Sequence, residues 1–297
     1  MKTVEIDSQS GFCGGVIRAI STAEEYLKVH GGRVYSLGAI VHNEEELSRL
    51  EAGGIVAIDK EDLEQIPGAG GETLLIRAHG EPPEVYSKIK GLGFNVIDCT
   101  CPVVLKLQQD IRAAYERMKA LPEPGQVLIY GKIGHPEVLG LVGQVGPDAL
   151  VVENVPQLRN LIATGLLDTA KEVELFSQTT MSPVEYGALA EVLRSSLLAP
   201  LKVHDTICSL VATRHRRLAD FAREHDVVIF VSGRHSSNGK VLCDLCKSVN
   251  IRTFHICGPS DLNPAWFRPD DKVGVSGATS TPKWLLERVA AAIENLQ

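Results

Sequence analysis

The feature that most constrains the fold of this chain is an alternation of short apolar segments with helical segments along its 297 residues. The short segments are rich in β-branched side chains, and most of the segments between them place apolar residues at helical spacing. This alternation predicts an α/β fold with mainly parallel sheets and right-handed crossovers. We expect strands at 3–6, 33–37, 73–77, 94–97, 126–130, 149–152, 173–177, 201–204, 227–232, 251–256 and 272–276.

One pattern, a strand followed by a cysteine and an amphipathic helix, occurs three times. The cysteines are Cys13, Cys101 and Cys208. A chain of this length accommodates two or three domains, and the pattern suits three pseudo-equivalent small α/β domains. We predict a first domain at 14–98 with Cys13 at its edge, a second at 99–204, and a third at 205–297 that includes the N-terminal strand 1–13.

Charge and hydropathy exclude several classes of protein. The formal net charge of −7 disfavours a nucleic-acid partner. No run approaches the roughly 18 apolar residues of a transmembrane helix, and Glu5 and Asp7 interrupt the N-terminus where a signal peptide would be apolar. We therefore expect a cytoplasmic protein with no membrane partner. The seven cysteines disfavour a disulfide framework and favour metal-binding, catalytic or buried thiols.

The three repeated cysteines are candidate metal ligands. Each is predicted at a helix N-terminus beyond the carboxyl end of a strand, where ligands bind in α/β sheets and where the thiolate is favoured. Any one of them alone is as readily a buried structural thiol, but their common context favours a shared three-thiolate site. Cys243 and Cys246 form a C-x-x-C on a predicted helix and are interpreted as structural or incidental.

Neutral polar side chains follow several other strands. A lone histidine is more often structural, and serine or asparagine at a turn is usually a cap. Gathered at one edge with helix N-termini, however, such groups predict a pocket for a phosphate or diphosphate. The candidates are His42, His79, His135, Thr179, Thr180, Ser236, Ser237, Asn238 and Ser280.

Glu137 is a candidate acid or base. A carboxylate at a strand end beside imidazoles and hydroxyls can relay protons. The alternative, that Glu137 only interacts with a helix dipole, remains equally open from the sequence. The sequence contains neither G-x-G-x-x-G nor a P-loop, so a built-in dinucleotide site is unsupported.

Eight sequence motifs occur in order along the chain: GFCGGVIRAI, GAIVHN, RAHGEPPEV, DCTCPVV, YGKIGHPEVLGLVGQ, QTTMS, DTIC and SSNGK. In this order they resemble the LytB family of iron–sulfur enzymes, the 4-hydroxy-3-methylbut-2-enyl diphosphate reductases, over essentially the whole chain. Members of that family perform the last step of the methylerythritol phosphate (MEP) route to isoprenoids.

The resemblance implies a trefoil of three α/β domains around a central cavity that holds a [4Fe–4S] cluster. Cys13, Cys101 and Cys208 would bind the cluster and leave one iron open for the substrate hydroxyl. The implied reaction is reductive dehydroxylation of the allylic diphosphate to isopentenyl and dimethylallyl diphosphate. Electrons would come from an external ferredoxin or flavodoxin.

The resemblance also implies roles for the polar residues. Glu137 would be the proton source, with Thr179 as its hydrogen-bonding partner near the substrate hydroxyl. The diphosphate ligands would be His42, His79, His135, Ser236, Asn238 and Ser280, with Ser237 adjacent. The GATSTP segment departs from the commoner family pattern, so Thr279 remains an alternative to Ser280. Cys99 also departs, because the family usually has alanine there.

Two rival functions remain open at this point. A mononuclear zinc hydrolase acting on a phosphorylated substrate would use cysteine and histidine ligands with a bound water. A non-catalytic iron–sulfur sensor would need the cysteines but not the polar pocket. Metal content and colour distinguish the first rival, since zinc is colourless.

Overall fold

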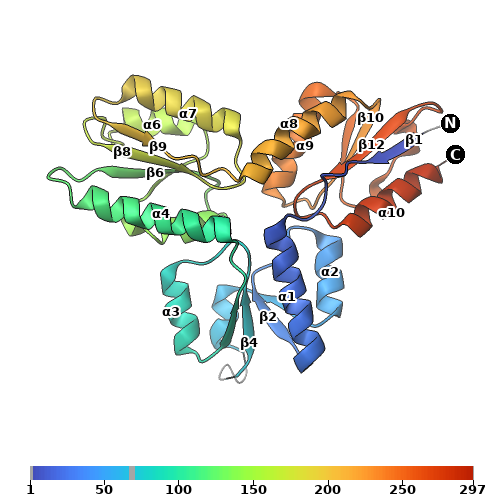
Figure 1. Ribbon diagram of the computed structural model, residues 1–297, viewed down its shortest axis with the longest axis horizontal. Helices are drawn as coiled ribbons and strands as arrows, with labels where there is room; N and C mark the ends of the chain where they lie inside the picture. The colour runs from blue at the N-terminus through green and yellow to red at the C-terminus, as the bar shows by residue number, and fades with distance from the viewer. Residues whose placement is uncertain (1–2, 67–70, 297) are drawn as a thin grey trace. The chain divides into compact units, whose positions relative to one another are not determined.

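The computed structural model describes residues 3–66 and 71–296, and the side chain of Ser237 lies outside the described part. Ten α-helices alternate with twelve strands in these ranges (Figure 1). The strands are β1 Thr3–Ile6, β2 Val34–Leu37, β3 Ile55–Ile58, β4 Thr73–Ile76, β5 Asn95–Asp98, β6 Gln126–Tyr130, β7 Leu150–Val152, β8 Val173–Ser177, β9 Leu201–Val203, β10 Val227–Val231, β11 Thr253–Ile256 and β12 Lys272–Gly277. The helices are α1 Gly14–His30, α2 Glu44–Ala52, α3 Pro83–Gly91, α4 Pro102–Lys119, α5 Pro136–Val142, α6 Val155–Ala163, α7 Pro183–Ser196, α8 Ser209–Arg223, α9 Ser237–Val249 and α10 Lys283–Glu294.

The strands form three parallel four-stranded sheets, which confirms the predicted α/β class. The strand orders are β1-β12-β10-β11, β3-β2-β4-β5 and β7-β6-β8-β9. The chain divides into two compact units, each described here by itself. The first unit comprises Met1–Gln65, Glu72–Arg77 and Ala212–Gln297, and the second comprises Ile66–Gly71 and Ala78–Val211. The three domain boundaries expected from the sequence stay a prediction.

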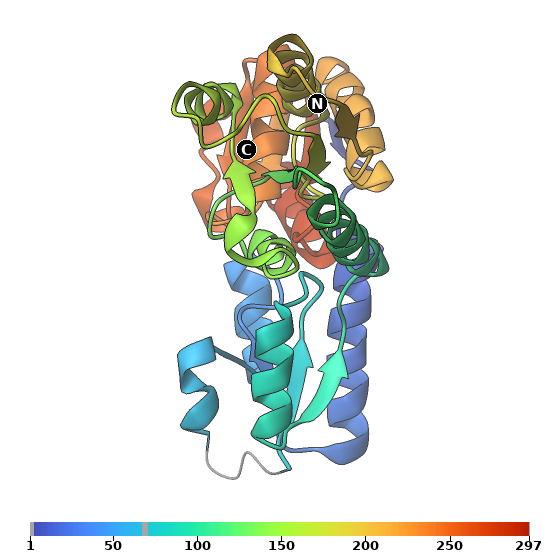
Figure 2. The ribbon, with the colours of Figure 1, turned by 90° about the vertical axis from the view of Figure 1, so that its left-hand side faces the viewer.

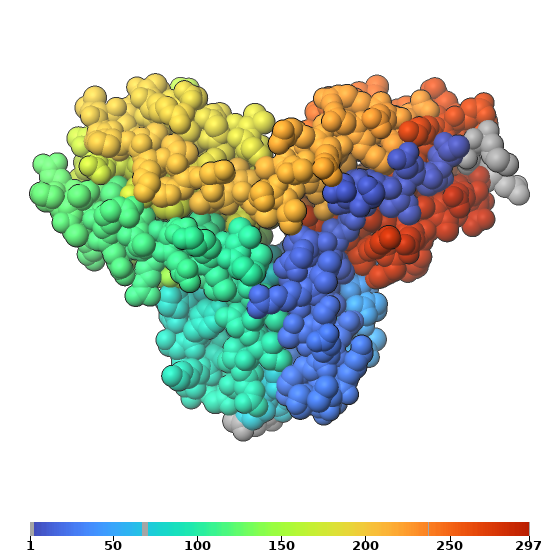
Figure 3. Space-filling model, in the orientation of Figure 1, coloured from blue at the N-terminus to red at the C-terminus, as the bar shows by residue number. Residues whose placement is uncertain are grey.

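In the first unit, the sheet β1-β12-β10-β11 is covered by helices on both faces. Ile229 and Val231 of β10 pack with Leu286 and Val289 of α10, whereas Phe230 points to the opposite face and packs with α8 and α9. This alternation follows from the two-residue period of a strand. β1 pairs with β12 in parallel, so the N-terminal residues, dark blue in Figure 3, lie against the red C-terminal part.

The strands β2, β3 and β4 also belong to the first unit. Figures 1 and 2 both show α1, in dark blue, beside these strands. β3 was not expected from the sequence, although all eleven expected strands are present with ends that agree within two residues. Its four apolar residues follow Gly53 and Gly54 directly, and a run this short is ambiguous between a strand and a loop.

The second unit contains the sheet β7-β6-β8-β9, again between helical layers. Leu128 of β6 and Leu175 of β8 face a core completed by α6 and α7. Ile129 and Phe176 face the other side, where Leu107 of α4 packs. The parallel pairing of β6 with β8 brings their carboxyl ends, and the loops that follow them, to one edge.

Candidate functional site

The three predicted cysteine ligands lie at helix N-termini, as the sequence indicates. Cys13 directly precedes α1, Cys101 precedes α4 with Pro102 at its first position, and Cys208 precedes Ser209 of α8. None of the three forms a disulfide within the described residues, and all three are partly exposed. A helix N-terminus stabilises negative charge, so each of the three positions by itself suits a thiolate that binds a metal. Cys13 belongs to the first unit, whereas Cys101 and Cys208 belong to the second.

A groove of about 490 Å³ in the second unit runs beside two of these helix starts. Cys208 and Ser209 line it on one side, and Pro102 and Lys106 of α4 line it on another. Asp205 also lines the groove. The Cys208 loop and the helix that starts after Cys101 therefore line the same groove.

Glu137 and Thr179 form the clearest chemical pair of the second unit. Glu137 lies in the first turn of α5 and is 1% exposed. Its carboxyl group accepts hydrogen bonds from the Thr179 backbone N at 2.7 Å and from the Thr179 hydroxyl at 2.9 Å. Burial raises the pKa of Glu137 to about 7, although both hydrogen bonds act to lower it. The pair can hold a proton at neutral pH.

The backbone of Thr179 joins this carboxyl group to a cysteine loop. Its N–H faces Glu137, and its carbonyl oxygen accepts a hydrogen bond from the Cys208 backbone N at 2.9 Å. The neighbouring Gln178 is fully buried, and its side-chain oxygen accepts a hydrogen bond from the Lys132 backbone N at 3.0 Å. Gln178 thus fixes the loop that leads from β6 to α5.

Gln178 was not expected from the sequence as a positioning residue. Its amide also donates to the Thr180 hydroxyl at 3.1 Å, so one side chain holds two strand-end segments. The only sequence signal for Gln178 is its place in QTT, directly before the candidate residues Thr179 and Thr180.

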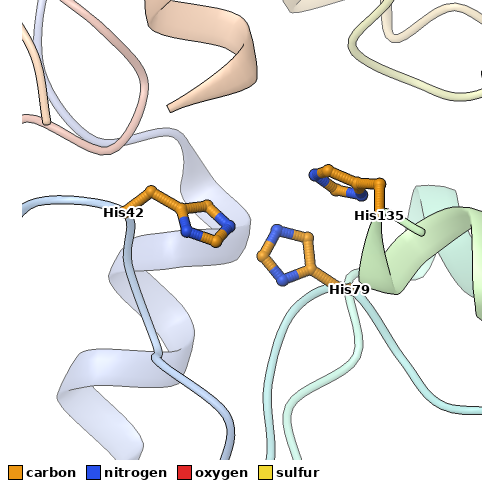
Figure 4. A group of neighbouring side chains, drawn as sticks. All are labelled: His42, His79 and His135. Carbon is orange, nitrogen blue, oxygen red and sulfur yellow. The ribbon is translucent and has the colours of Figure 1, made fainter. Parts of the chain in front are cut away.

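His79 and His135 lie together in the second unit. Their rings meet edge to face, with centroids 5.3 Å apart (Figure 4). Nδ1 of His135 accepts a hydrogen bond from the Glu137 backbone N at 3.1 Å, which leaves its Nε2 to carry the proton at neutral charge. The Cys101 backbone N donates to the carbonyl oxygen of Ala78, the residue before His79, at 3.0 Å.

His42, also labelled in Figure 4, belongs to the first unit and follows β2. The backbone around it is closely packed. A Cβ added at Gly233, which follows β10, would lie 2.1 Å from the His42 carbonyl oxygen. Only glycine fits at this approach.

The predicted diphosphate ligands of the first unit gather where β10 and β12 end. The hydroxyl oxygens of Ser236 and Ser280 lie 3.3 Å apart, and the Asn238 amide donates to the Thr279 hydroxyl at 2.8 Å. Asn238 Oδ1 is buried and has no hydrogen-bond partner within the described part of the chain. These neutral donors can bind an anion without a lysine or arginine. The hydroxyl of Thr279 pairs with Asn238 and that of Ser280 pairs with Ser236, so the choice between them as a phosphate ligand stays a prediction. The side chain of Ser237 lies outside the described residues.

The remaining cysteines lie apart from this chemistry. Cys243 and Cys246 are buried on α9 in the core, where burial raises the pKa of both thiols. Cys99 is also buried. Within the described ranges, no helix is both long and apolar enough to cross a membrane.

Comparison with known proteins agrees with the resemblance inferred from the motifs. The family model described as "LytB protein" matches residues 4–294. Proteins named 4-hydroxy-3-methylbut-2-enyl diphosphate reductase from Bacteroides thetaiotaomicron and Porphyromonas gingivalis are each 43% identical to this chain, and each alignment covers at least 99% of both sequences.

Two solved structures extend this similarity to the fold. A structure of (E)-4-hydroxy-3-methyl-but-2-enyl diphosphate reductase has a TM-score of 0.69 and 31% identity, over 98% of each chain. The Plasmodium falciparum E-1-hydroxy-2-methyl-but-2-enyl-4-diphosphate reductase has a TM-score of 0.87 and 26% identity, over 99% of this chain and 88% of that one. The chain therefore belongs to the LytB protein family and is an enzyme of the oxidoreductase class.

Proposed function

We propose that this enzyme reductively dehydroxylates (E)-4-hydroxy-3-methylbut-2-enyl diphosphate to isopentenyl and dimethylallyl diphosphate, the last step of the MEP pathway. The C–O bond of the allylic alcohol breaks, and the oxygen leaves as water. Two electrons and two protons complete the balance, one proton going to the water and one to carbon. The observation that carries this proposal is the buried Glu137 carboxyl group, whose pKa of about 7 suits proton delivery at neutral pH.

The proposed cofactor is a [4Fe–4S] cluster held by Cys13, Cys101 and Cys208. When bound, such a cluster supplies electrons and an open iron position for the substrate hydroxyl. Three thiolates instead of the usual four leave that position free. The placement of each cysteine at a helix N-terminus supports the assignment, because each thiolate is stabilised there.

The protein's own residues divide the remaining work. Glu137 delivers the proton, and Thr179 orients its carboxyl group through two hydrogen bonds. The diphosphate is held by His42, His79, His135, Ser236, Asn238 and Ser280, with Ser237 adjacent. Binding energy from the diphosphate, distant from the reacting carbon, positions the hydroxyl group.

Electrons come from a partner, a reduced ferredoxin or flavodoxin, and the enzyme works in the cytoplasm. The absence of a dinucleotide motif from the sequence supports an external donor. A contact with such a donor is expected to be small and transient.

The first experiment is an anaerobic purification, with iron, sulfide and zinc measured per chain and a visible spectrum recorded before and after adding the hydroxylated diphosphate. We expect about four irons and four sulfides, with a spectrum that responds to the substrate. Turnover with a chemical reductant should then release both isomeric products. One zinc per chain and a colourless sample would instead favour the hydrolase.

A further inference from the structure

A buried arginine lies beside the Cys13 loop in the first unit. Arg214 of α8 is 8% exposed. Its guanidinium donates to the Gly11 carbonyl oxygen at 3.2 Å and to the Gly277 carbonyl oxygen at 2.5 Å. Gly11 lies two residues before Cys13 with a φ of +115°, which favours glycine. The side chain therefore joins the Cys13 loop to the end of β12.

The charge of Arg214 is not matched by any carboxylate in hydrogen-bonding contact among the described residues. Its Nε is buried without a hydrogen-bond partner in that part of the chain. Asp7, the nearby acid, accepts its hydrogen bonds from the Ser276 hydroxyl at 2.8 Å and from the Gln9 backbone N at 2.9 Å. A buried cation with an unused donor is costly unless an anion compensates it.

Cys13 is the other group that would favour the charge of Arg214, because its backbone lies two residues from a carbonyl that Arg214 contacts. Burial lowers the pKa of Arg214, and Asp7 and then Cys13 oppose that change. The Cys13 backbone N donates to the Thr279 carbonyl at 3.3 Å, two residues beyond the carbonyl that Arg214 holds. Arg214 thus hydrogen-bonds to both backbone segments that position Cys13.

We propose that Arg214 is a positioning residue that supplies the buried positive charge for the anionic cluster bound at Cys13 and raises its reduction potential. This inference rests on the cluster assigned under the proposed function. A fixed positive charge favours the more negative, reduced form of the cluster because attraction grows with each added electron. Both the charge and the two carbonyl contacts contribute, and substitution separates them.

Three variants separate the charge from the shape of the side chain. Arg214→Lys keeps the charge but loses the planar fork. Arg214→Gln and Arg214→Met lose the charge, and the Met side chain also loses the donors. The matched control is Arg252→Gln, which removes another arginine of the first unit that is ion-paired with Asp271 at 2.7 Å.

The readout is the midpoint potential of the reconstituted cluster, measured by redox titration alongside iron content. We expect Arg214→Gln and Arg214→Met to make one-electron reduction about tenfold less favourable, a shift of about 59 mV to more negative potential. Arg214→Lys should recover most of that shift, and Arg252→Gln should match the wild type. A wild-type potential in both neutral variants would overturn the proposal.

A second measurement keeps the inference testable if a variant does not load iron. In the metal-free proteins at fixed pH, the rate of iodoacetamide alkylation at Cys13 is compared with the rates at Cys101 and Cys208. Loss of the arginine charge should slow Cys13 alone several-fold, because less thiolate is present. Unchanged relative rates would contradict the proposal. Absence of a cluster from the wild type would contradict the proposed function instead, and the alkylation comparison would still decide the role of Arg214.

Discussion

Glu137 and Thr179 are joined by two hydrogen bonds, of 2.7 Å from the Thr179 backbone N and 2.9 Å from its hydroxyl. A substitution such as Thr179→Ala or Thr179→Val removes the Thr179 hydroxyl but keeps the backbone N–H. The Glu137 carboxyl group therefore keeps one of its two orienting hydrogen bonds. Burial nevertheless raises the pKa of Glu137 to about 7. Burial is thus the largest influence on the pKa of Glu137, whereas the two hydrogen bonds orient its carboxyl group and offset part of the rise in pKa.

Replacing Glu137 with Gln should abolish most turnover. An amide of nearly the same shape keeps one oxygen that can accept a hydrogen bond from Thr179, but it delivers no proton. General acid catalysis typically contributes about 10²–10⁴-fold. We expect kcat to fall within that range while iron content stays at the wild-type level. Glu116→Gln, on the exposed side of α4, is the control and should retain full activity. Unchanged turnover in Glu137→Gln would remove this residue from the mechanism.

The same carboxyl group should make stability depend on pH. The pKa of Glu137 in the folded protein is about 7, above the ordinary value of 4.5, so the folded state retains the proton to higher pH. The proton bound at Glu137 contributes fully to the free energy of unfolding below pH 4.5. This contribution is lost as the pH rises through about 7, so the free energy of unfolding falls by about 3 kcal/mol by pH 8. Urea unfolding should therefore show that Glu137→Gln gains stability over the wild type at pH 8 but not at pH 4.5. If the free energy of unfolding of Glu137→Gln differed from that of the wild type by the same amount at both pH values, the raised pKa would be contradicted.

Replacing Ser236 with Ala should weaken diphosphate binding. Ser236 caps α9, because its hydroxyl accepts a hydrogen bond from the Gly239 backbone N at 3.0 Å, so the variant also loses about 1 kcal/mol of stability. Ser182 caps α7 in the same manner, and Ser182→Ala provides the matched control. Steady-state kinetics should show a raised KM in Ser236→Ala alone. A similar KM in the two variants would assign Ser236 to capping only.

Replacing Cys13 with Ser should remove the cluster or its intact form. Cys257 offers a matched control, since it is also free and partly exposed and follows a strand, β11. We expect iron and sulfide per chain to fall in Cys13→Ser and to stay unchanged in Cys257→Ser. Full iron content and normal activity in Cys13→Ser would refute the three-thiolate assignment.

Replacing Gly233 with Ala should displace the segment that carries His42. The added Cβ would lie 2.1 Å from the His42 carbonyl oxygen, so the backbone must shift, at a cost of about 1–3 kcal/mol. A Cβ added at Gly187 of α7 would point into open space, with no side chain or other segment within 4 Å. Gly187→Ala should therefore stabilise the helix by about 1 kcal/mol. In thermal unfolding, we expect Gly233→Ala to lower the melting temperature and Gly187→Ala to raise it. KM should rise only for Gly233→Ala.

Local sequence patterns predicted most of the fold. β10 was predictable because its five residues are all apolar and four of them are valine or isoleucine, and Cys101 was placed correctly because Pro102 marks a helix start. β3 was not predicted because it contains only four apolar residues. A run this short shows no periodicity that would distinguish a strand from a loop.

The candidate site was predictable only where the residues follow strands directly. Glu137 and Thr179 each follow a strand that the sequence marks, so their shared edge could be expected. Arg214 could not be found in this way. Its carbonyl partners lie 203 and 63 residues away along the chain, and arginine on a helix is ordinarily exposed. No local pattern encodes burial that depends on such distant partners.

The parallel pairing of β1 with β12 has a consequence for the order of events during synthesis. The segment with Cys13 is translated before residues 272–279, yet its strand pairs with β12 and the Cys13 backbone N donates to the Thr279 carbonyl oxygen. The backbone contacts that position Cys13 therefore form only after those later residues have been translated. Under the proposed function, the site for a cluster at Cys13 would be complete only from that stage of synthesis onward.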